Sequence, residues 1–427
     1  MISKILLVNP NTVKNPPVIP IGLEYLLTAL EKEKVQVDVL DLCFATNPSE
    51  ELNRKLEQNS YDFVGFSIRN VDSTLFFNNE FYLPAIKELV KCAREFGLKT
   101  IIGGSGFSAM PEEILDYMGA DYGIIGPGEI ALLKLLNMWQ NNATEEKIID
   151  GWQYGPDSNL VHIRGNLFDY PRYLSLEGIT GFETQKGCTN ECPYCVEAKT
   201  SVWFKNIPNI IKEIQNLVDM GYNHFHTCDC EFNINLKYSI EFLRQLVESK
   251  IPLKWTLYMK PYPYNEEFFR LLSESNAYLI TLTVDSDERT QSLNNYSYDD
   301  LAKIIDYCNK YNIKLVIDAL TGYPYELLES TIKMIEFFKE NRPSSVGIGF
   351  YFRIFKNTEL SKLISSDKNL QMRLSRSLAQ NENFLEPIFY HHLEQNQLKS
   401  LFAGDDLFKI AGLTEGVNYQ LDDVKDE

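Results

Sequence analysis

The stretch "GCTNECPYC" (187–195) places Cys188, Cys192 and Cys195 within eight residues, in a chain of 427 that holds eight cysteines in all. Thiolate sulfur binds zinc and iron–sulfur clusters. A structural zinc site usually takes four ligands in two pairs, and no second pair lies nearby in the sequence. A four-iron cluster held by three cysteines would leave one iron open, as catalytic metal centres require. The spacing favours such a cluster, with zinc as the alternative.

The position of this loop supports the same interpretation. Strand-like and helix-like runs alternate over 178–355, which predicts parallel α/β architecture. Six units are fewer than the eight of a complete barrel, so we expect a partial (β/α)6 barrel. The cysteine loop follows the first strand, at the face where such barrels hold active sites. The expected strands are 178–184, 223–229, 253–260, 278–285, 313–320 and 344–352.

The CxxxCxxC spacing, with Tyr194 before the third cysteine, resembles the radical S-adenosylmethionine superfamily. The resemblance implies that S-adenosylmethionine chelates the open iron of a [4Fe-4S] cluster through its amino and carboxylate groups. One electron from the cluster would then break the sulfonium C–S bond and give a 5′-deoxyadenosyl radical. It also implies an external electron donor of flavodoxin or ferredoxin type. The protein would position the reactants and exclude water.

The resemblance also implies contacts to S-adenosylmethionine at the ends of later strands. Asp229 and Glu231 in "TCDCEFN" would hold the ammonium group, although solvated turn carboxylates are the alternative. Cys228 and Cys230, which flank Asp229, are expected to share one face as packing residues. Lys260 could reach a carboxylate.

Two further strand ends complete the expected set. Asp285 and Ser286 in "TVDS" match the position that contacts the ribose, and "LTGYPYE" is similar to a family turn. There Gly322 would let the backbone approach the adenine, and Pro324 would fix the turn. The residues expected at S-adenosylmethionine are Tyr194, Asp229, Glu231, Lys260, Asp285, Ser286 and Gly322. No catalytic residue is assigned.

Residues 1–142 form the first alternation of strands and helices, which predicts a doubly wound sheet. Such sheets bind ligands at the carboxyl ends of their strands. The stretches "FVGFSI", "IIGGSGFSAMPEEIL" and "ADYGIIGPGE" resemble the cobalamin-binding domain fused to many radical S-adenosylmethionine enzymes. The expected strands are 4–8, 35–42, 62–68, 99–104 and 121–126. The resemblance implies cobalamin contacts at Asn11, Ser67, Arg69, Asn70, Gly103, Gly104, Ser105, Gly126, Gly128 and Glu129.

One departure concerns the lower ligand of cobalt. Cobalamin domains with a DxHxxG motif ligate cobalt through its histidine, but no histidine precedes His162 in this chain. Ligation by histidine is therefore excluded within the first domain, and Arg69 or Asn70 could lie below the cobalt. The alternative is a degenerate flavodoxin-like domain that only supports the barrel or its substrate.

The remaining segments carry weaker signals. We expect a linker over 143–177 with a short strand at 160–165, a mostly helical segment over 356–427 and disorder over the last eight residues. Tyr390, His391 and His392 could touch the substrate or be ordinary helix residues. No run is long and apolar enough for a membrane span, and "MISKILLVNP" is expected to be a first strand, not a signal peptide.

Composition excludes one class of partner. The formal charge of −18 and the pI near 4.9 argue against nucleic acid, since affinity there depends on Lys and Arg. Clustered cysteines without an export signal predict a reducing cytoplasm. We therefore expect a cobalamin-dependent radical S-adenosylmethionine enzyme that methylates an unactivated carbon of a small molecule. The alternatives are a rearrangement or cyclisation enzyme without methyl transfer, and a cobalamin- or metal-responsive binding protein without turnover.

Overall fold

The computed structural model describes residues 4–141, 143, 146–402 and 404–410. Contacts divide the chain into two compact units whose composition differs from the expected domains. The first unit comprises the chain up to residue 73, with 80–182 and 203–222. The second unit comprises 74–79, 183–202 and the chain from 223 onward. The helix that follows the cysteine loop therefore belongs to the first unit.

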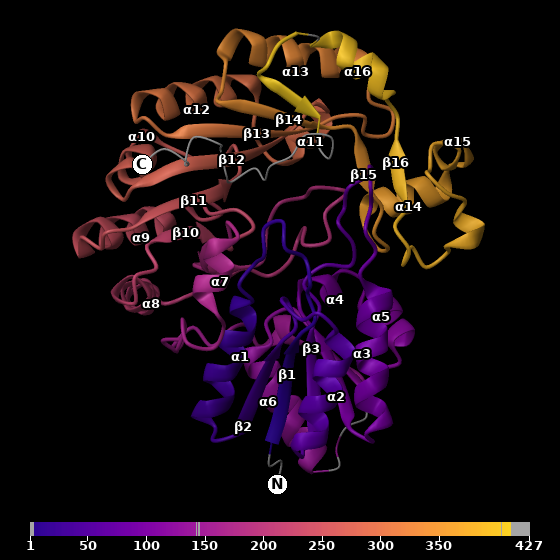
Figure 1. Ribbon diagram of the computed structural model, residues 1–427. Helices are drawn as coiled ribbons and strands as arrows, with labels where there is room; N and C mark the ends of the chain where they lie inside the picture. The colour runs from indigo at the N-terminus through magenta and orange to yellow at the C-terminus, as the bar shows by residue number, and fades with distance from the viewer. Residues whose placement is uncertain (1–3, 142, 144–145, 403, 411–427) are drawn as a thin grey trace. The chain divides into compact units, whose positions relative to one another are not determined.

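The first unit is built on a parallel sheet in the order β2-β1-β3-β4-β5-β6. Helices cover both faces of this sheet, as Figure 1 shows, so its central strands are apolar on both sides. The five expected strands are confirmed, and a sixth forms within the expected linker. The strands are β1 (Lys4–Asn9), β2 (Gln36–Asp41), β3 (Phe63–Ser67), β4 (Lys99–Gly103), β5 (Tyr122–Ile125) and β6 (Ile148–Asp150).

The helices of this unit pack in two groups. One group contains α1 (Ile21–Lys32) and α6 (Glu129–Gln140), and the other contains α2 (Pro48–Gln58), α3 (Leu83–Glu95) and α5 (Pro111–Met118). The short helix α4 (Ser105–Ala109) begins immediately after β4. Strand order reverses between β1 and β3, and ligands bind at such a switch point in open α/β sheets.

Part of the carboxyl edge of this sheet is occupied by the chain itself. Helix α7 (Tyr170–Ser175) carries Tyr173, whose hydroxyl donates to Asp41 at 2.9 Å. Asn9 donates to the same carboxylate at 2.8 Å and lies 3.4 Å from the Tyr173 oxygen. Asn9 and Asp41 end β1 and β2, so the edge open to a ligand lies over β3, β4 and β5.

Asp169 caps the helix that holds Tyr173 in place. Its side chain accepts a hydrogen bond from the Arg172 backbone N–H at 3.2 Å. We expect Asp169→Ala to lower the free energy of unfolding by about 0.5–2 kcal/mol, because the N-cap is lost. Urea unfolding followed by circular dichroism measures this. The control is Asp306→Ala, on the exposed face of α12 (Tyr298–Lys310) and away from its cap. Equal stability of the two variants would contradict the prediction.

The strand expected at 160–165 does not form, because side chains take the backbone groups that a strand would pair. The N–H of His162 donates to Glu213 at 2.9 Å, and that of Ile163 to Thr28 at 3.0 Å. The N–H of Gly165 donates to Glu24 at 3.0 Å. Side chains from two helices, one carrying Glu24 and Thr28 and the other carrying Glu213, thus hold this segment in an irregular conformation.

Glu24 is also the centre of a buried ionic network. Arg164 Nε donates to Glu24 at 2.9 Å, and the Tyr170 hydroxyl donates to the same carboxylate at 2.8 Å. Arg164 further donates to the Gly181 carbonyl at 2.8 Å. Gly181 belongs to β7 (Thr180–Phe182), which leads into the cysteine loop. Paired in this way, the buried charges do not carry the full desolvation cost.

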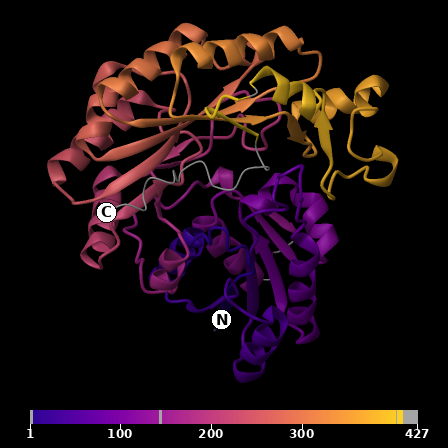
Figure 2. The ribbon, with the colours of Figure 1, turned by 45° about the horizontal axis from the view of Figure 1, so that its top comes forward.

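The second unit contains six strands of a parallel sheet, in the order β17-β14-β13-β12-β11-β10. Its helices lie along one face of the curved sheet (Figure 2), which is the layout of a partial barrel. The strands are β10 (His224–Thr227), β11 (Lys254–Met259), β12 (Ala277–Asp285), β13 (Lys314–Leu320), β14 (Ser345–Gly349) and β17 (Phe408–Ile410). The helices are α9 (Leu236–Ser249), α10 (Glu266–Glu274), α12 (Tyr298–Lys310) and α13 (Leu328–Asn341).

The C-terminal segment combines helices and strands. Its described helices are α14 (Glu359–Ser366), α15 (Lys368–Gln371) and α16 (Gln395–Leu401), while β15 (Tyr351–Arg353) pairs with β16 (Phe389–His391). Strand β17, which lies in the segment expected to be mostly helical, pairs with β14 and extends the sheet. The last eight residues, where disorder was expected, lie outside the described part. None of the helices described in the structure combines the length and apolar character needed to cross a bilayer.

Candidate active site

The cysteine loop is a closed turn that the chain's own backbone holds in shape. Thr200 accepts the Cys188 N–H through its hydroxyl at 2.9 Å and donates its own N–H to the Cys188 carbonyl at 3.0 Å. Gly187 has a φ of +89°, and a Cβ there would lie 2.0 Å from the Ser201 carbonyl oxygen. Only glycine fits this position, so the loop enters its turn directly after β8 (Gln185–Lys186).

The three thiols share one electrostatic environment. Burial, with smaller contributions from the nearby charges of Glu231 and Cys195, raises the pKa of the Cys188 thiol to about 12. Burial likewise raises the pKa of Cys192 and of Cys195, with added anionic contributions from Glu231. Burial thus outweighs the groups that lower these pKa values, such as Lys260 near Cys188, so the three thiolates need additional positive charge. Iron would supply that positive charge, because metal binding and thiol deprotonation are coupled.

These cysteines suit a cluster better than a single ion. Among the residues that the structure describes, no three His, Cys, Asp or Glu side chains are arranged to hold one metal ion. In a four-iron cluster, each cysteine binds a different iron, so the sulfurs need not converge on one point. Three neighbouring thiols in one rigid loop thus fit the group that the sequence pattern predicts.

The two acidic residues after β10 have different surroundings. Asp229 is buried and accepts hydrogen bonds from the N–H groups of Thr184 and Gln185, at 2.7 and 3.1 Å. The Thr184 hydroxyl donates to its other oxygen at 2.6 Å. Burial raises the pKa of Asp229 to about 7. Asp229 therefore fixes the turn before the cysteine loop, with most of its acceptor capacity in use.

Glu231 is half-buried and retains free acceptor capacity. Its Oε2 is shielded from solvent and has no hydrogen-bond partner among the described residues. Burial raises its pKa to about 8, while the Lys260 charge acts in the opposite direction. Lys260 itself donates to Asn190 of the cysteine loop at 3.1 Å. The structure thus brings Glu231 and Lys260 together beside the cysteines, and Glu231 has an oxygen free to accept from a ligand.

Tyr194 and Asp285 are also brought together. The Tyr194 hydroxyl donates to Asp285 at 2.9 Å, and the Asp285 N–H donates to the Tyr296 hydroxyl at 2.9 Å. Burial raises the pKa of Asp285 to about 7. The Tyr194 hydroxyl thus joins the middle residue of "PYC" to the end of β12, so the loop and the strand end are connected directly.

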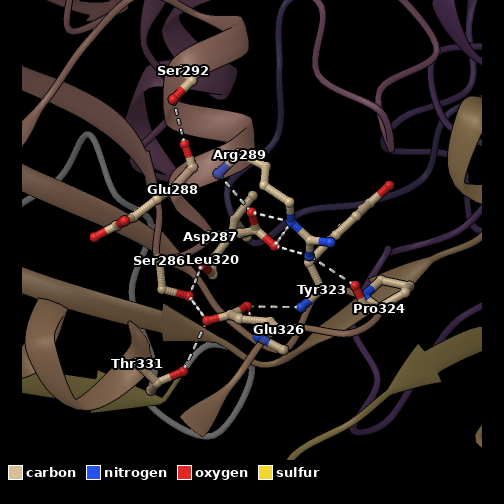
Figure 3. A network of polar contacts seen from close by, with 11 residues as sticks. Ser286, Asp287, Glu288, Arg289, Ser292, Leu320, Tyr323, Pro324, Glu326 and Thr331 are labelled. Carbon is tan, nitrogen blue, oxygen red and sulfur yellow. Dashed lines mark hydrogen bonds and ion pairs between the residues drawn. The ribbon is translucent and has the colours of Figure 1, made fainter. Parts of the chain in front are cut away.

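Ser286 and Gly322 are linked through a residue to which the sequence reasoning assigned no role. Figure 3 shows Glu326 at the centre of this network, where Ser286 and Thr331 donate to one of its oxygens. The N–H groups of Gly322 and Tyr323 donate to the other oxygen at 2.8 and 3.0 Å. Glu326 therefore builds the turn expected at the adenine. The acidic end of "GYPYE" was the signal that could have identified it.

A second ion pair flanks the same turn. Arg289 pairs with Asp287 and donates to the Pro324 carbonyl at 3.0 Å (Figure 3). Asp287 also caps α11 (Glu288–Leu293) by accepting the Arg289 N–H at 2.8 Å. Pro324 thus lies in a turn that is held from both sides.

The expectation that Cys228 and Cys230 share a packed face is wrong. Strand β10 ends at Thr227, so strand alternation does not extend to these residues. Cys228 is exposed, whereas Cys230 is half-buried and its thiol donates to Glu197. The pKa of Cys230 is raised by burial and by the charges of Glu197, Cys188 and Cys195, which places its thiol near the loop. Cys43 and Cys308 are buried, and Cys92 is half-buried.

In the first unit, the ends of β3 and β4 are drawn closely together. Gly103 accepts the Ile68 N–H at 2.7 Å, and Ser105 donates to the Arg69 carbonyl at 2.8 Å. Gly104 has a φ of +96°, and a Cβ there would lie 2.5 Å from the Ile68 carbonyl oxygen. The side chains of Ser105 and Arg69 remain exposed at this edge. A flat ligand surface can therefore approach the backbone here.

The end of β5 supplies an unpaired acidic group. Glu129, the first residue of α6, is 2% exposed, and neither carboxylate oxygen has a hydrogen-bond partner among the described residues. Gly126 donates its N–H to Ser108 at 3.0 Å, beside the Trp152 indole. Buried acceptors of this kind require donors. The amide side chains of a corrin ring carry such donors, so the edge fits cobalamin in its chemistry.

The other residues expected at cobalamin lie around the same sheet edge. Ser67 pairs with Gly103 at the end of β3, Asn70 is exposed, and Gly128 caps α6. Asn11 follows β1 and folds its own turn by accepting the Val13 N–H at 3.1 Å. His162 is buried, and its Nδ1 is hydrogen-bonded to Glu213 of the same unit.

The candidate substrate residues differ in their surroundings. Tyr390 is fully buried, whereas His391 lies on β16 with its ring 5.7 Å from that of Phe76. The Cβ of His392 lies 3.7 Å from where a Cβ of Gly322 would stand. Of the three, His392 is therefore the one beside the expected adenine contact.

Family comparisons match both parts of the chain. The B12 binding domain model matches residues 12–136, and the Radical SAM superfamily model matches residues 182–338. The first matched range contains the sheet edge with Glu129. The second contains the cysteine loop and the strand-end residues of the second unit up to Glu326.

Two curated relatives are methyltransferases. Tryptophan 2-C-methyltransferase from Streptomyces laurentii is 24% identical over 475 residues, which cover 91% of this chain and 78% of the relative. Cytidylyl-2-hydroxyethylphosphonate methyltransferase from Streptomyces wedmorensis is 21% identical, covering 66% of this chain and 65% of the relative.

Solved structures share the fold over nearly the whole chain. The radical S-adenosylmethionine methyltransferase TsrM from Kitasatospora setae, with cobalamin and a [4Fe-4S] cluster bound, superposes with a TM-score of 0.85 at 24% identity. That match covers 96% of this chain and 93% of TsrM. The cobalamin-dependent S-adenosylmethionine radical enzyme OxsB gives 0.70 at 13% identity, over 94% of this chain and 66% of OxsB. The chain therefore belongs to the radical S-adenosylmethionine superfamily, among the enzymes that carry an N-terminal B12-binding domain.

Proposed function

We propose that this enzyme binds a [4Fe-4S] cluster, S-adenosylmethionine and cobalamin, and methylates an unactivated carbon of a small molecule. The observation that carries the proposal is the pairing of two sites in one chain. One is a loop of three neighbouring thiols beside an unpaired carboxylate, and the other is a sheet edge with a buried, unpaired acidic acceptor. Methyltransferase relatives that align along most of the chain support the reaction type.

The residues of the second unit have distinct tasks in this proposal. Cys188, Cys192 and Cys195 bind three irons of the cluster. Glu231 accepts hydrogen bonds from the ammonium group of S-adenosylmethionine. When bound, S-adenosylmethionine and cobalamin supply the methyl group and the initiating radical.

Other strand ends would orient the nucleoside of S-adenosylmethionine. Asp285, held by Tyr194, presents a carboxylate at the ribose position, beside Ser286. Glu326 positions the backbone of Gly322 for the adenine. Lys260 places positive charge beside the thiolates, and Asp229 fixes the turn before them.

The first unit would hold cobalamin by its edge over β3, β4 and β5. The backbone at Gly103, Gly104 and Ser105 allows close approach, and Glu129 accepts from corrin amides. The lower face of cobalt would meet Arg69 or Asn70, because no histidine precedes His162 in the chain and His162 itself is 2% exposed. The supporting residues are Asn11, Ser67, Gly126 and Gly128.

Two cellular requirements belong to the proposal. A one-electron donor of flavodoxin or ferredoxin type would reduce the cluster from outside. All eight cysteines are free thiols, which suits a reducing cytoplasm.

The test is anaerobic reconstitution of the full chain with iron, sulfide and hydroxocobalamin. Visible spectra and metal analysis should show one four-iron cluster and one cobalamin per chain. Electron paramagnetic resonance of the bound cob(II)alamin should lack superhyperfine splitting from a protein imidazole nitrogen, since His162 is buried and no histidine precedes it. Cobalamin that fails to bind would refute the assignment of the first unit, and splitting from an imidazole would refute the lower-face assignment.

Product mass tests the reaction. Candidate amino acids and other small molecules, with tryptophan first because a relative acts on it, are incubated with S-adenosylmethionine and reductant. Methylation adds one CH₂ to the substrate. A product of unchanged carbon count would instead indicate a rearrangement or cyclisation.

A further inference from the structure

Asn294 connects the end of α11 to the cysteine loop through its side-chain amide. Nδ2 donates to Cys192 Sγ at 3.6 Å and to the Thr290 carbonyl at 3.2 Å. Oδ1 accepts the backbone N–H of Glu191 at 3.2 Å. The residue is 9% exposed, so these contacts are largely shielded from water. The amide oxygen and both amide hydrogens each have one partner within the chain.

The orientation of this amide is fixed by its neighbours. The Glu191 N–H can only donate, and the Thr290 carbonyl can only accept. A flipped amide would set two donors against each other at Glu191 and two acceptors against each other at Thr290. The second amide hydrogen of Asn294 is therefore directed at the Cys192 sulfur.

A hydrogen bond to a cluster sulfur acts on the charge of the cluster. Reduction transfers one electron from an external one-electron donor to the cluster, with no bond formed or broken. The added negative charge spreads onto the thiolates, and donors to sulfur stabilise it. Most charged groups near Cys192 are anionic, namely Asp285, Glu231 and the other two thiols, and these oppose reduction. The cation Lys260 also interacts with Cys192 and acts in the opposite direction.

We propose that Asn294 raises the reduction potential of the cluster by donating a hydrogen bond to the Cys192 thiolate. Asn294 is thus a positioning residue, since it acts through a ligand and touches no substrate. The inference rests on the proposed function, because it requires a cluster held by the three cysteines. Cys188 and Cys195 have no such side-chain donor among the contacts described. Cys192 therefore differs from them in receiving a hydrogen bond from a side chain.

The test is a dye-mediated redox titration of the anaerobically reconstituted full chain, read by electron paramagnetic resonance. Asn294→Asp keeps the shape of the side chain but replaces the donor by an anionic oxygen. We expect the reduction equilibrium to become about tenfold less favourable, a shift of about 59 mV to lower potential for one electron. Asn294→Ala removes the donor without adding charge and should shift the potential in the same direction by less.

The control is Asn265→Asp at the N-cap of α10, where Asn and Asp cap equally well, away from the cysteines. Its potential should equal that of the unmodified chain. An unchanged potential in both Asn294 variants, with full cluster content, would overturn the inference. So would loss of the cluster in both, since the contact would then serve assembly. If the unmodified chain assembles no cluster, the proposed function itself fails, so the two failures are distinguishable.

Discussion

Replacing any one of Cys188, Cys192 and Cys195 by Ala should abolish the visible absorbance of the cluster and reduce bound iron to background. Each thiol binds a different iron, so losing one leaves an iron without a protein ligand in a site that already has one open position. The measurement is the ultraviolet-visible spectrum and the iron and sulfide content after anaerobic reconstitution.

Two other cysteines provide matched controls. Cys308→Ala removes a fully buried thiol on α12, and Cys230→Ala removes one that lies near Cys188 and Cys195. Both variants should retain the cluster, because neither thiol is a ligand. A chain lacking all three loop cysteines that still assembles the cluster would refute the assignment. Loss of the cluster in Cys230→Ala would instead identify Cys230 as a fourth ligand.

Glu231→Gln should weaken the binding of S-adenosylmethionine by roughly 10- to 150-fold. A charge-assisted hydrogen bond to the ammonium group contributes about 1.5–3 kcal/mol, which gives this factor. Titration of the reduced, reconstituted chain, read by the paramagnetic spectrum of the cluster, measures the affinity. Asp229→Asn should have a smaller effect on direct binding, because the chain already occupies three acceptor sites of Asp229.

The pH dependence gives this prediction a second signature. Burial raises the pKa of Glu231 to about 8, and only the ionised carboxylate attracts an ammonium group. Below this pH, binding must first release a proton, so affinity should rise with pH and level off above about 8. The slope should disappear in Glu231→Gln and persist in Glu241→Gln, an exposed residue of α9. Native affinity in Glu231→Gln, or lost cluster absorbance, would contradict the assigned role.

Much of the architecture follows from local patterns in the sequence. Alternating apolar strands and amphipathic helices predict both sheets, since each strand must bury its faces under helices. The cysteine spacing identifies the cluster loop, because ligands within one turn need no knowledge of the fold. Glycine-rich strand ends predict the open edge over β3, β4 and β5.

The contacts that shape the site depend on residues far apart in the chain. Asn294 meets Cys192 across 102 residues, and Glu326 meets Ser286 across 40. No local spacing encodes such contacts, so sequence reasoning assigned neither residue a role. The prediction of a strand at 160–165 was wrong for a related reason. Distant side chains, Glu24 and Glu213, compete successfully for the backbone N–H groups.

Because α8 (Ile207–Asp219) belongs to the first unit, the chain cannot be cut into two domains at the expected boundary without loss of contacts. Its apolar face, with Ile210, Ile214 and Leu217, is fully buried, and its Glu213 pairs with His162. A cut at the expected boundary near residue 178 would remove this cover from the B12-binding part and leave buried His162 unpaired. The two units are therefore interleaved along the chain, and no single cut in the sequence separates them.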